Sequence, residues 1–389
     1  MSNITPFRVE VSDAELDDLR AGLRRTRLAP EFANDDWRYG THGPYLKKFL
    51  HYWEHDYDWR KHEAAINAQP QFMTRIDNIP IHFIHAKGKG PRPIPLILSH
   101  GWPWTFWDWH KLIGPLTDPA AHGGDAADAF DVVVPSLPGF AYSTPLTTTG
   151  INFWRTADLW VTLMREVLGY DKFAAGGGDW GALLTTQLGH RHAEHLIGIY
   201  LHLMAPLDIF NAPFPGAELF TPEEAEWQQR NEKFFTRESG YSAIQSTKPQ
   251  TVAFALNDSP AGLAAWIIEK RRTWSDCGGD VERRFSKDDL ATTLTIYWMT
   301  QCYGSSARYY YECVNNPWRP SHDRKPVVEA PTGVGVFPRE VVMLPRRWAE
   351  QYYNLQHWTQ MKSGGHFAPM EEPQALIDDL RAFYRGLRR

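Results

Sequence analysis

The chain has 389 residues, of which 43% are hydrophobic, and a net charge of −5. This length favours one large α/β domain with additions, or two domains. Acidic and basic residues are interspersed, which argues against a nucleic-acid-binding surface. No window approaches the roughly 20 apolar residues that span a bilayer. Three widely spaced cysteines and an N-terminus without a signal-peptide pattern predict a cytoplasmic protein.

Aromatic residues are abundant, with 17 Trp, 16 Tyr and 20 Phe. A core rich in large side chains and a binding cavity walled by aromatic rings explain this content equally well.

The first 90 residues are predicted to form a helical segment that ends in two strands. Ser12 and Glu15 have the spacing of a capping box, which predicts a helix start. A second helix is expected over 45–57. The stretch 73–88 is predicted to form a hairpin of two strands that turns at Asp77 and Asn78.

From residue 94 the pattern predicts buried strands that alternate with helices. Short apolar runs without alternation are typical of strands buried on both faces. The predicted strands are 94–100, 130–136, 172–178 and 196–204, and the predicted helices are 152–169 and 179–192. This order favours a mostly parallel, doubly wound sheet.

Residues 205–318 interrupt that alternation with helices. Thr221 before Pro222 and Ser259 before Pro260 mark two helix starts. Strands are expected again at 325–338 and 353–361, and a closing helix at 371–387. We therefore predict four parts: an N-terminal segment (1–90), the first part of an α/β core (91–204), a helical lid (205–318) and the second part of the core (319–389).

The stretch GGGDWG, residues 176–181, has the form of the strand-to-helix turn that displays the nucleophile of an α/β-hydrolase. Its central position holds Asp179 instead of Ser or Cys. A helix N-terminus favours the ionised carboxylate, so no base is needed to activate it. A capped helix start or a phosphate-binding loop would explain this stretch equally well when it is read alone.

Two further motifs favour the hydrolase interpretation. HGWP follows the first core strand, where backbone N–H groups of Trp102 and Trp180 would form an oxyanion hole around Asp179. His366 follows the last predicted strand, as the general base of this fold does. Glu340 follows the preceding strand and fits the acid that orients the base. Trp102-Pro103 is a candidate cis bond, and His100 is expected to be a packing or turn residue.

The helical insertion offers tyrosines that could assist a carboxylate nucleophile. Attack on a saturated carbon needs a good leaving group, or an acid that protonates a poor one. Tyrosine stays protonated at neutral pH and can hydrogen-bond an oxygen that becomes an alkoxide. Candidates are Tyr241 and the run Tyr309–Tyr311.

Several motifs together resemble the microsomal-type epoxide hydrolases, a group that includes insect juvenile hormone epoxide hydrolases and soluble fungal and bacterial relatives. They are GGGDWG, HGWP, PSLPGFAYS (135–143), ESGYSAIQSTKP (238–249), LNDSPAGLAAWIIEK (256–270), PTGVGVFPRE (331–340) and SGGHFAPMEEP (363–373). The stretch 59–85 also resembles the N-terminal meander that helps to fix the lid in this family. The resemblance covers essentially the whole chain and implies an α/β-hydrolase fold.

The resemblance also implies the roles of the site residues. Asp179 would be the nucleophile, His366 the base and Glu340 the charge-relay acid. Tyr241 and Tyr310 would activate the epoxide oxygen, with Tyr309 and Tyr311 open as alternatives to Tyr310. The two tyrosines, with Trp102 and Trp180, are also the predicted substrate-binding residues.

The expected reaction converts a bulky apolar epoxide to a vicinal diol through an ester of Asp179. The expected partners are this epoxide and water, with no nucleic acid, membrane, metal or cofactor, and a homodimer stays open. The histidines of 190–195 and 51–62 lack the partners of a metal site. A haloalkane dehalogenase, in which Trp N–H groups would hold a halide, is the main alternative. A binding receptor on a hydrolase fold would not need a water-activating pair.

Overall fold

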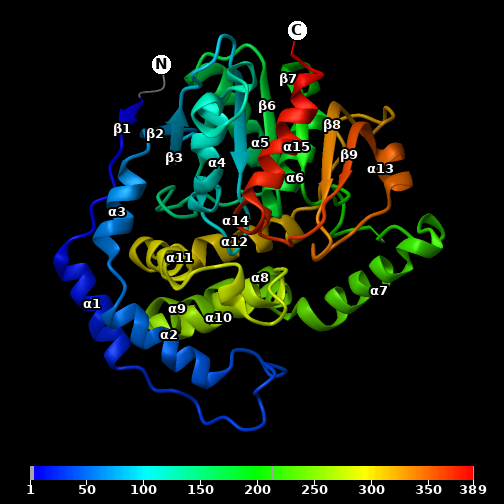
Figure 1. Ribbon diagram of the computed structural model, residues 1–389. Coiled ribbons are helices and arrows are strands. Elements are labelled where there is room, and N and C mark those ends of the chain that lie inside the picture. The colour runs from blue at the N-terminus through cyan, green and yellow to red at the C-terminus, as the bar shows by residue number, and fades with distance from the viewer. Residues whose placement is uncertain (1–3, 213, 389) are drawn as a thin grey trace.

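A mixed β-sheet forms the centre of the computed structural model, which describes residues 4–212 and 214–388 (Figure 1). The described strands form a nine-stranded sheet in the order β1-β2-β3-β5-β4-β6-β7-β8-β9. The pairs from β1 to β5 along this order are antiparallel and the pairs from β5 to β9 are parallel. The strands are β1 (Thr5–Pro6), β2 (Gln71–Ile76), β3 (Ile79–Ala86), β4 (Ile94–Ser99), β5 (Phe130–Pro135), β6 (Phe173–Gly177), β7 (Leu196–Leu201), β8 (Val328–Val336) and β9 (Tyr353–Gln360). The predicted mostly parallel sheet is confirmed.

Helices cover both faces of this sheet. On one face α4 (His110–Thr117) contacts α15 (Pro373–Arg385), and on the other α5 (Phe153–Val161) contacts α6 (Trp180–Arg191) (Figure 1). The short helix α13 (Arg346–Tyr352) contacts β9, and the short helix α14 (Ala368–Glu371) contacts α15 and α4. All residues of α6 from Trp180 to His190 are buried, so this helix lies in the core.

Most observed elements differ from the predicted ones by a few residues at their ends, among them the strand predicted at 196–204 and the helix predicted at 152–169. The predicted strand 196–204 ends at Leu201, where its pairing with both neighbours ends, at Gly177 of β6 and Val334 of β8. The predicted helix 152–169 is α-helical to Val161 and continues as a π-helix over Thr162–Val167. The predicted hairpin is confirmed.

Helices of the lid lie at the carboxyl ends of the core strands (Figure 1). They are α7 (Ala225–Lys233), α8 (Gly240–Thr247), α9 (Pro249–Asp258), α10 (Pro260–Thr273), α11 (Lys287–Thr300) and α12 (Tyr303–Asn315). Ser259 caps α10, whereas Thr221 begins a 3-10 turn that leads into α7. None of the described helices is both long and apolar enough to cross a membrane.

The N-terminal helices α1 (Asp13–Arg24), α2 (Gly43–His55) and α3 (Trp59–Asn67) pack against the lid helices α10 and α11. The predicted capping box of α1 is present. Three hydrogen bonds tie the segment to α11: Tyr52 Oη to Asp288 Oδ1 (2.6 Å), Trp53 Nε1 to Thr295 Oγ1 (3.0 Å) and Tyr57 Oη with Thr292 Oγ1 (2.9 Å). The boundaries of the four predicted parts, at residues 90, 204 and 318, stay predictions. Residues 1–3, 213 and 389 lie outside the described chain.

Candidate active site

Asp179 occupies a sharp turn between β6 and α6. Its backbone has φ 51° and ψ −128°, a conformation that costs a non-glycine residue roughly 1–3 kcal/mol. The turn also brings strand and helix backbones together. A Cβ on Gly177 would lie 2.5 Å from the carbonyl of Gly181, and a Cβ on Gly181 would lie 2.0 Å from Ser99 O. The small residues of GGGDWG are therefore required by this close approach.

Asp179, His366 and Glu340 come together at the carboxyl ends of three strands. His366 Nε2 lies 3.2 Å from Asp179 Oδ2, and His366 Nδ1 lies 2.6 Å from Glu340 Oε1. The backbone N–H of Val341 donates to the same Glu340 oxygen (2.6 Å). Because Glu340 Oε1 accepts from Nδ1, the Nε2 atom is directed to Asp179.

One of the two predicted oxyanion-hole donors contacts the carboxylate directly. The N–H of Trp102 donates to Asp179 Oδ1 (2.8 Å), and the Trp102-Pro103 bond is cis as expected. Trp180 follows Asp179 as the first residue of α6, and its N–H as second donor stays a prediction. Oδ1 is thus held, whereas Oδ2 faces His366. His100 is buried and accepts from Leu137 N, which is the packing role expected for it.

The electrostatics of His366 depend on its two carboxylate neighbours. Burial alone lowers the pKa of this side chain, but Glu340 and Asp179 outweigh that effect and raise its pKa to about 10. The rings of Trp104 and Trp274 stand edge-on to the imidazole at 5.5 and 5.2 Å between ring centroids. The two carboxylates therefore favour the charged imidazolium form of the buried His366.

Two of the candidate tyrosines face each other across from Asp179. Tyr241 lies on α8 and Tyr310 on α12, with ring centroids 5.7 Å apart. Burial raises the pKa of both hydroxyls, and the Asp179 charge raises them further. Both groups are therefore protonated donors at neutral pH.

The other two tyrosines of the run point elsewhere. Tyr309 donates its hydroxyl to Thr156 Oγ1 (2.9 Å), and Tyr311 is 41% exposed. Successive helical residues point in different directions, so only one of three consecutive side chains faces the cavity.

Asp179, Tyr241 and Tyr310 line an apolar cavity of about 350 Å³. They are its ionisable lining residues. The other lining residues are Trp180, Leu183, Leu203, Ala205, Ile209, Phe210, Phe234, Phe235, Ser239, Ser242, Trp274, Val341 and Val342. Trp102, predicted to bind substrate, instead stacks its ring on Tyr241 at 5.1 Å and is fully buried.

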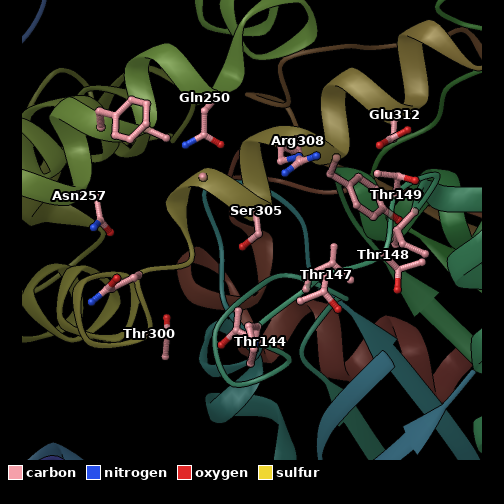
Figure 2. A pocket seen from close by; sticks show the side chains of 18 of the residues that line it. Thr144, Thr147, Thr148, Thr149, Gln250, Asn257, Thr300, Ser305, Arg308 and Glu312 are labelled. Atoms are coloured by element: carbon pink, nitrogen blue, oxygen red, sulfur yellow. The ribbon is translucent and has the colours of Figure 1, made fainter. Parts of the chain in front are cut away.

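A larger cavity of about 740 Å³ lies between the loop 144–151 and the helices α9 and α12 (Figure 2). Its labelled side chains are mostly polar: Thr144, Thr147, Thr148, Thr149, Gln250, Asn257, Thr300, Ser305, Arg308 and Glu312. Of the candidate tyrosines, Tyr309 lines this cavity, whereas Tyr241 and Tyr310 do not, and Asp179, Glu340 and His366 are also absent from its lining. The smaller, apolar cavity is therefore the candidate active site.

The clustered histidines are occupied in structural contacts. His190 Nδ1 bonds to Val327 O (2.7 Å), His192 pairs with Asp158 (2.8 Å), and His62 lies 3.3 Å from Asp288. Within residues 4–212 and 214–388, no group of three or more His, Cys, Asp or Glu side chains has the arrangement of a metal site.

Comparisons with known proteins agree with this geometry. Residues 4–109 match the family described as "Epoxide hydrolase N terminus", and residues 94–243 match the "alpha/beta hydrolase fold". Epoxide hydrolase 1 of Oryctolagus cuniculus is 38% identical, over 98% of this chain and 88% of that protein. The chain belongs to the epoxide hydrolase family.

Other members of the epoxide hydrolase family are similar over the same length. Juvenile hormone epoxide hydrolase 2 of Ctenocephalides felis is 33% identical, over 97% of this chain and 85% of its own. The crystal structure of juvenile hormone epoxide hydrolase from Bombyx mori matches with a TM-score of 0.86 and 28% identity, over 100% of this chain and 95% of the other. The protein is thus a hydrolase with the α/β-hydrolase fold, as predicted.

Proposed function

We propose that the protein opens an epoxide to a vicinal diol through a covalent ester on Asp179. The observation that carries this proposal is the shared cavity of Asp179, Tyr241 and Tyr310, with His366 behind the nucleophile. A carboxylate nucleophile and two hydroxyl donors suit a leaving group that is an oxygen. Family membership supports the same reaction.

In the first step, Asp179 Oδ2 attacks a ring carbon while Tyr241 and Tyr310 donate hydrogen bonds to the epoxide oxygen. A bond from Oδ2 to carbon forms, the carbon–oxygen bond of the ring breaks, and the oxygen takes a proton from one of the two tyrosine hydroxyls. Oδ1 stays with the N–H of Trp102 and becomes the carbonyl oxygen of the ester.

In the second step, His366 acts as the base. Esterification removes the negative charge of Asp179, which is one of the two charges that raise the pKa of His366. The imidazole then releases its proton to solvent, and the tyrosine that protonated the opened oxygen regains a proton from solvent, so the total number of protons in the site is balanced. Neutral His366 deprotonates a water that attacks the ester carbonyl. The backbone N–H of Trp102 stabilises the oxyanion at Oδ1. Collapse releases the diol and restores ionised Asp179 and protonated His366.

The substrate we propose is a bulky apolar epoxide. A cavity of about 350 Å³ holds a molecule of aryl or branched alkyl size, and its walls are mainly aromatic and aliphatic. Apolar walls of this kind favour the burial of apolar substrate surface, and burying a charged group against them would be unfavourable. A haloalkane dehalogenase is not favoured, because the relatives that match over nearly the whole chain are epoxide hydrolases and two tyrosine hydroxyls line the cavity with Asp179.

Oxygen labelling tests this mechanism. During turnover of an aryl epoxide such as styrene oxide in ¹⁸O-water, label is expected in the peptide that contains Asp179. In a single turnover with unlabelled enzyme, the diol is expected to carry no label, because its new oxygen comes from Oδ2. A labelled diol with an unlabelled peptide would indicate direct attack by water and contradict the proposal. Chloride release from a haloalkane, without diol formation, would support the alternative reaction.

A further inference from the structure

His202 lies beneath the nucleophile turn, although no role in the reaction has been assigned to it. It directly follows β7, and its ring lies against the backbone of Gly178, where a Cβ would come 1.9 Å from Nε2. Its ring stacks on Trp104 at 5.8 Å between centroids, and Trp104 in turn contacts His366. The glycine before Asp179 therefore provides the space for this imidazole.

The polar atoms around His202 lack partners. Neither ring nitrogen of His202 hydrogen-bonds to any protein group that the structure describes, and both are buried. One carboxylate oxygen of Glu340 also lacks a partner. Oε1 accepts from His366 and Val341, whereas Oε2 is buried without a donor among the described residues. Buried polar atoms of native proteins nearly always have a partner, and a carboxylate oxygen needs one most.

A small cavity joins these two residues. Its volume is about 10 Å³, which is the size that one water molecule needs. His202 and Glu340 are its charged or strongly polar lining residues, and all of its lining residues are buried: His202, Leu203, Met204, Val334, Gly335, Val336, Phe337, Glu340, Val342, Met343 and Leu344.

His202 is suited to donate to such a water as a neutral ring. Burial, together with the nearby charge of His366, lowers the pKa of His202 to about 3. A neutral imidazole has one N–H donor. The N–H can donate to a water oxygen, and the water can donate a hydrogen to Glu340 Oε2.

We propose that one water molecule binds between His202 and Glu340 Oε2, and that His202 acts through it as a positioning residue for the carboxylate. The water holds Oε2, so that Oε1 stays aligned with Nδ1 of His366. This role rests on the proposed function, because it concerns the step in which His366 is the base. Ring opening by Asp179 does not need that alignment.

Two measurements test the proposal. The first is a high-resolution crystal structure of the unmodified enzyme, which is expected to show one ordered water within hydrogen-bond distance of Glu340 Oε2 and a ring nitrogen of His202. The second is rapid-quench kinetics with styrene oxide, in which the ester on Asp179 is followed by mass spectrometry. His202→Leu is expected to slow hydrolysis of the ester about tenfold or more, as the loss of a hydrogen bond to a charged group does, with ester formation within about twofold. His202→Gln, which keeps a donor, is expected to recover most of the loss.

His82 provides a matched control, because it is also a fully buried histidine and its partners Gln71 and Ser136 lie outside the site. His82→Leu is expected to lower stability in urea without changing the ratio of the two rates. No water at the named position, or an equal fall of both rates in His202→Leu, would overturn the proposal. Absence of any ester or diol would instead refute the proposed function, and the crystal structure would still decide the water site.

Discussion

The Nε2 atom of His366 lies 3.2 Å from Oδ2 of Asp179, and this is the carboxylate oxygen that Trp102 leaves free. One carboxylate oxygen therefore accepts from a backbone N–H while the other faces the imidazole. In the mechanism that we propose, the first oxygen becomes the oxyanion, the second attacks carbon, and His366 with Glu340 behind it activates water.

Loss of the base is expected to trap the ester. His366→Gln removes the group that activates water but leaves Asp179 and both tyrosines in place. We expect ester hydrolysis to fall by about 10²–10⁴-fold, which is the usual contribution of general base catalysis, while the ester still forms. Intact-mass measurement after mixing with epoxide should show one added substrate per enzyme. Asp179→Ala is the control and should show no added mass.

Tyr241→Phe and Tyr310→Phe are each expected to slow ester formation by about 10²-fold, since one donor to a developing oxyanion has an effect of this size. Hydrolysis of the ester should change much less. Tyr309→Phe is a matched control, because the adjacent tyrosine bonds to Thr156 and does not line the cavity. Stopped-flow measurement of single turnovers separates the two steps. An equal loss in Tyr309→Phe would contradict the assignment of Tyr310.

The raised pKa of His366 predicts a pH-dependent stability. The folded pKa of about 10 exceeds the ordinary value of 6.5, so the folded state binds this proton more tightly. The contribution of His366 to stability is complete below pH 6.5 and is lost as the pH rises towards 10. The difference in the free energy of unfolding between the wild type and His366→Gln should therefore shrink over this range in urea titrations. Because Asp179 is one of the groups that raise the pKa of His366, this stability contribution should be lost at lower pH in an Asp179→Ala background.

Cavity size should decide which epoxides are accepted. Ala205 is buried in the cavity wall, and Ala205→Phe would fill part of the 350 Å³ space. We expect kcat/KM for styrene oxide to fall by about tenfold or more, while propylene oxide is affected far less. Steady-state kinetics with both epoxides checks this, and an equal loss for both would indicate damage to the catalytic groups instead.

Chain order and local motifs predicted the nucleophile turn and its two partners. The glycines around Asp179 are a local sequence motif of this fold. Glu340 and His366 follow successive strands, in the order that is usual for the acid and the base of this fold. The choice of Tyr310 over Tyr309 was beyond those signals, because it depends on how α12 packs. Cavity-wall residues such as Trp274 and Phe210 come from distant segments without a motif. His202 gave no signal at all, since a lone histidine after an apolar strand is most often a packing residue.

The hydrogen bonds between the N-terminal segment and α11 have a consequence for folding. They join positions 235 to 242 residues apart, among the longest loops that the chain has to close. Contacts of such sequence separation have a large loop-closure cost, so we expect them to form late in folding. During synthesis, residues 52–57 leave the ribosome long before residues 288–295 are made. The lid that carries both tyrosines is therefore held by the part of the chain that is made first, and we expect the active site to be among the last regions to become complete.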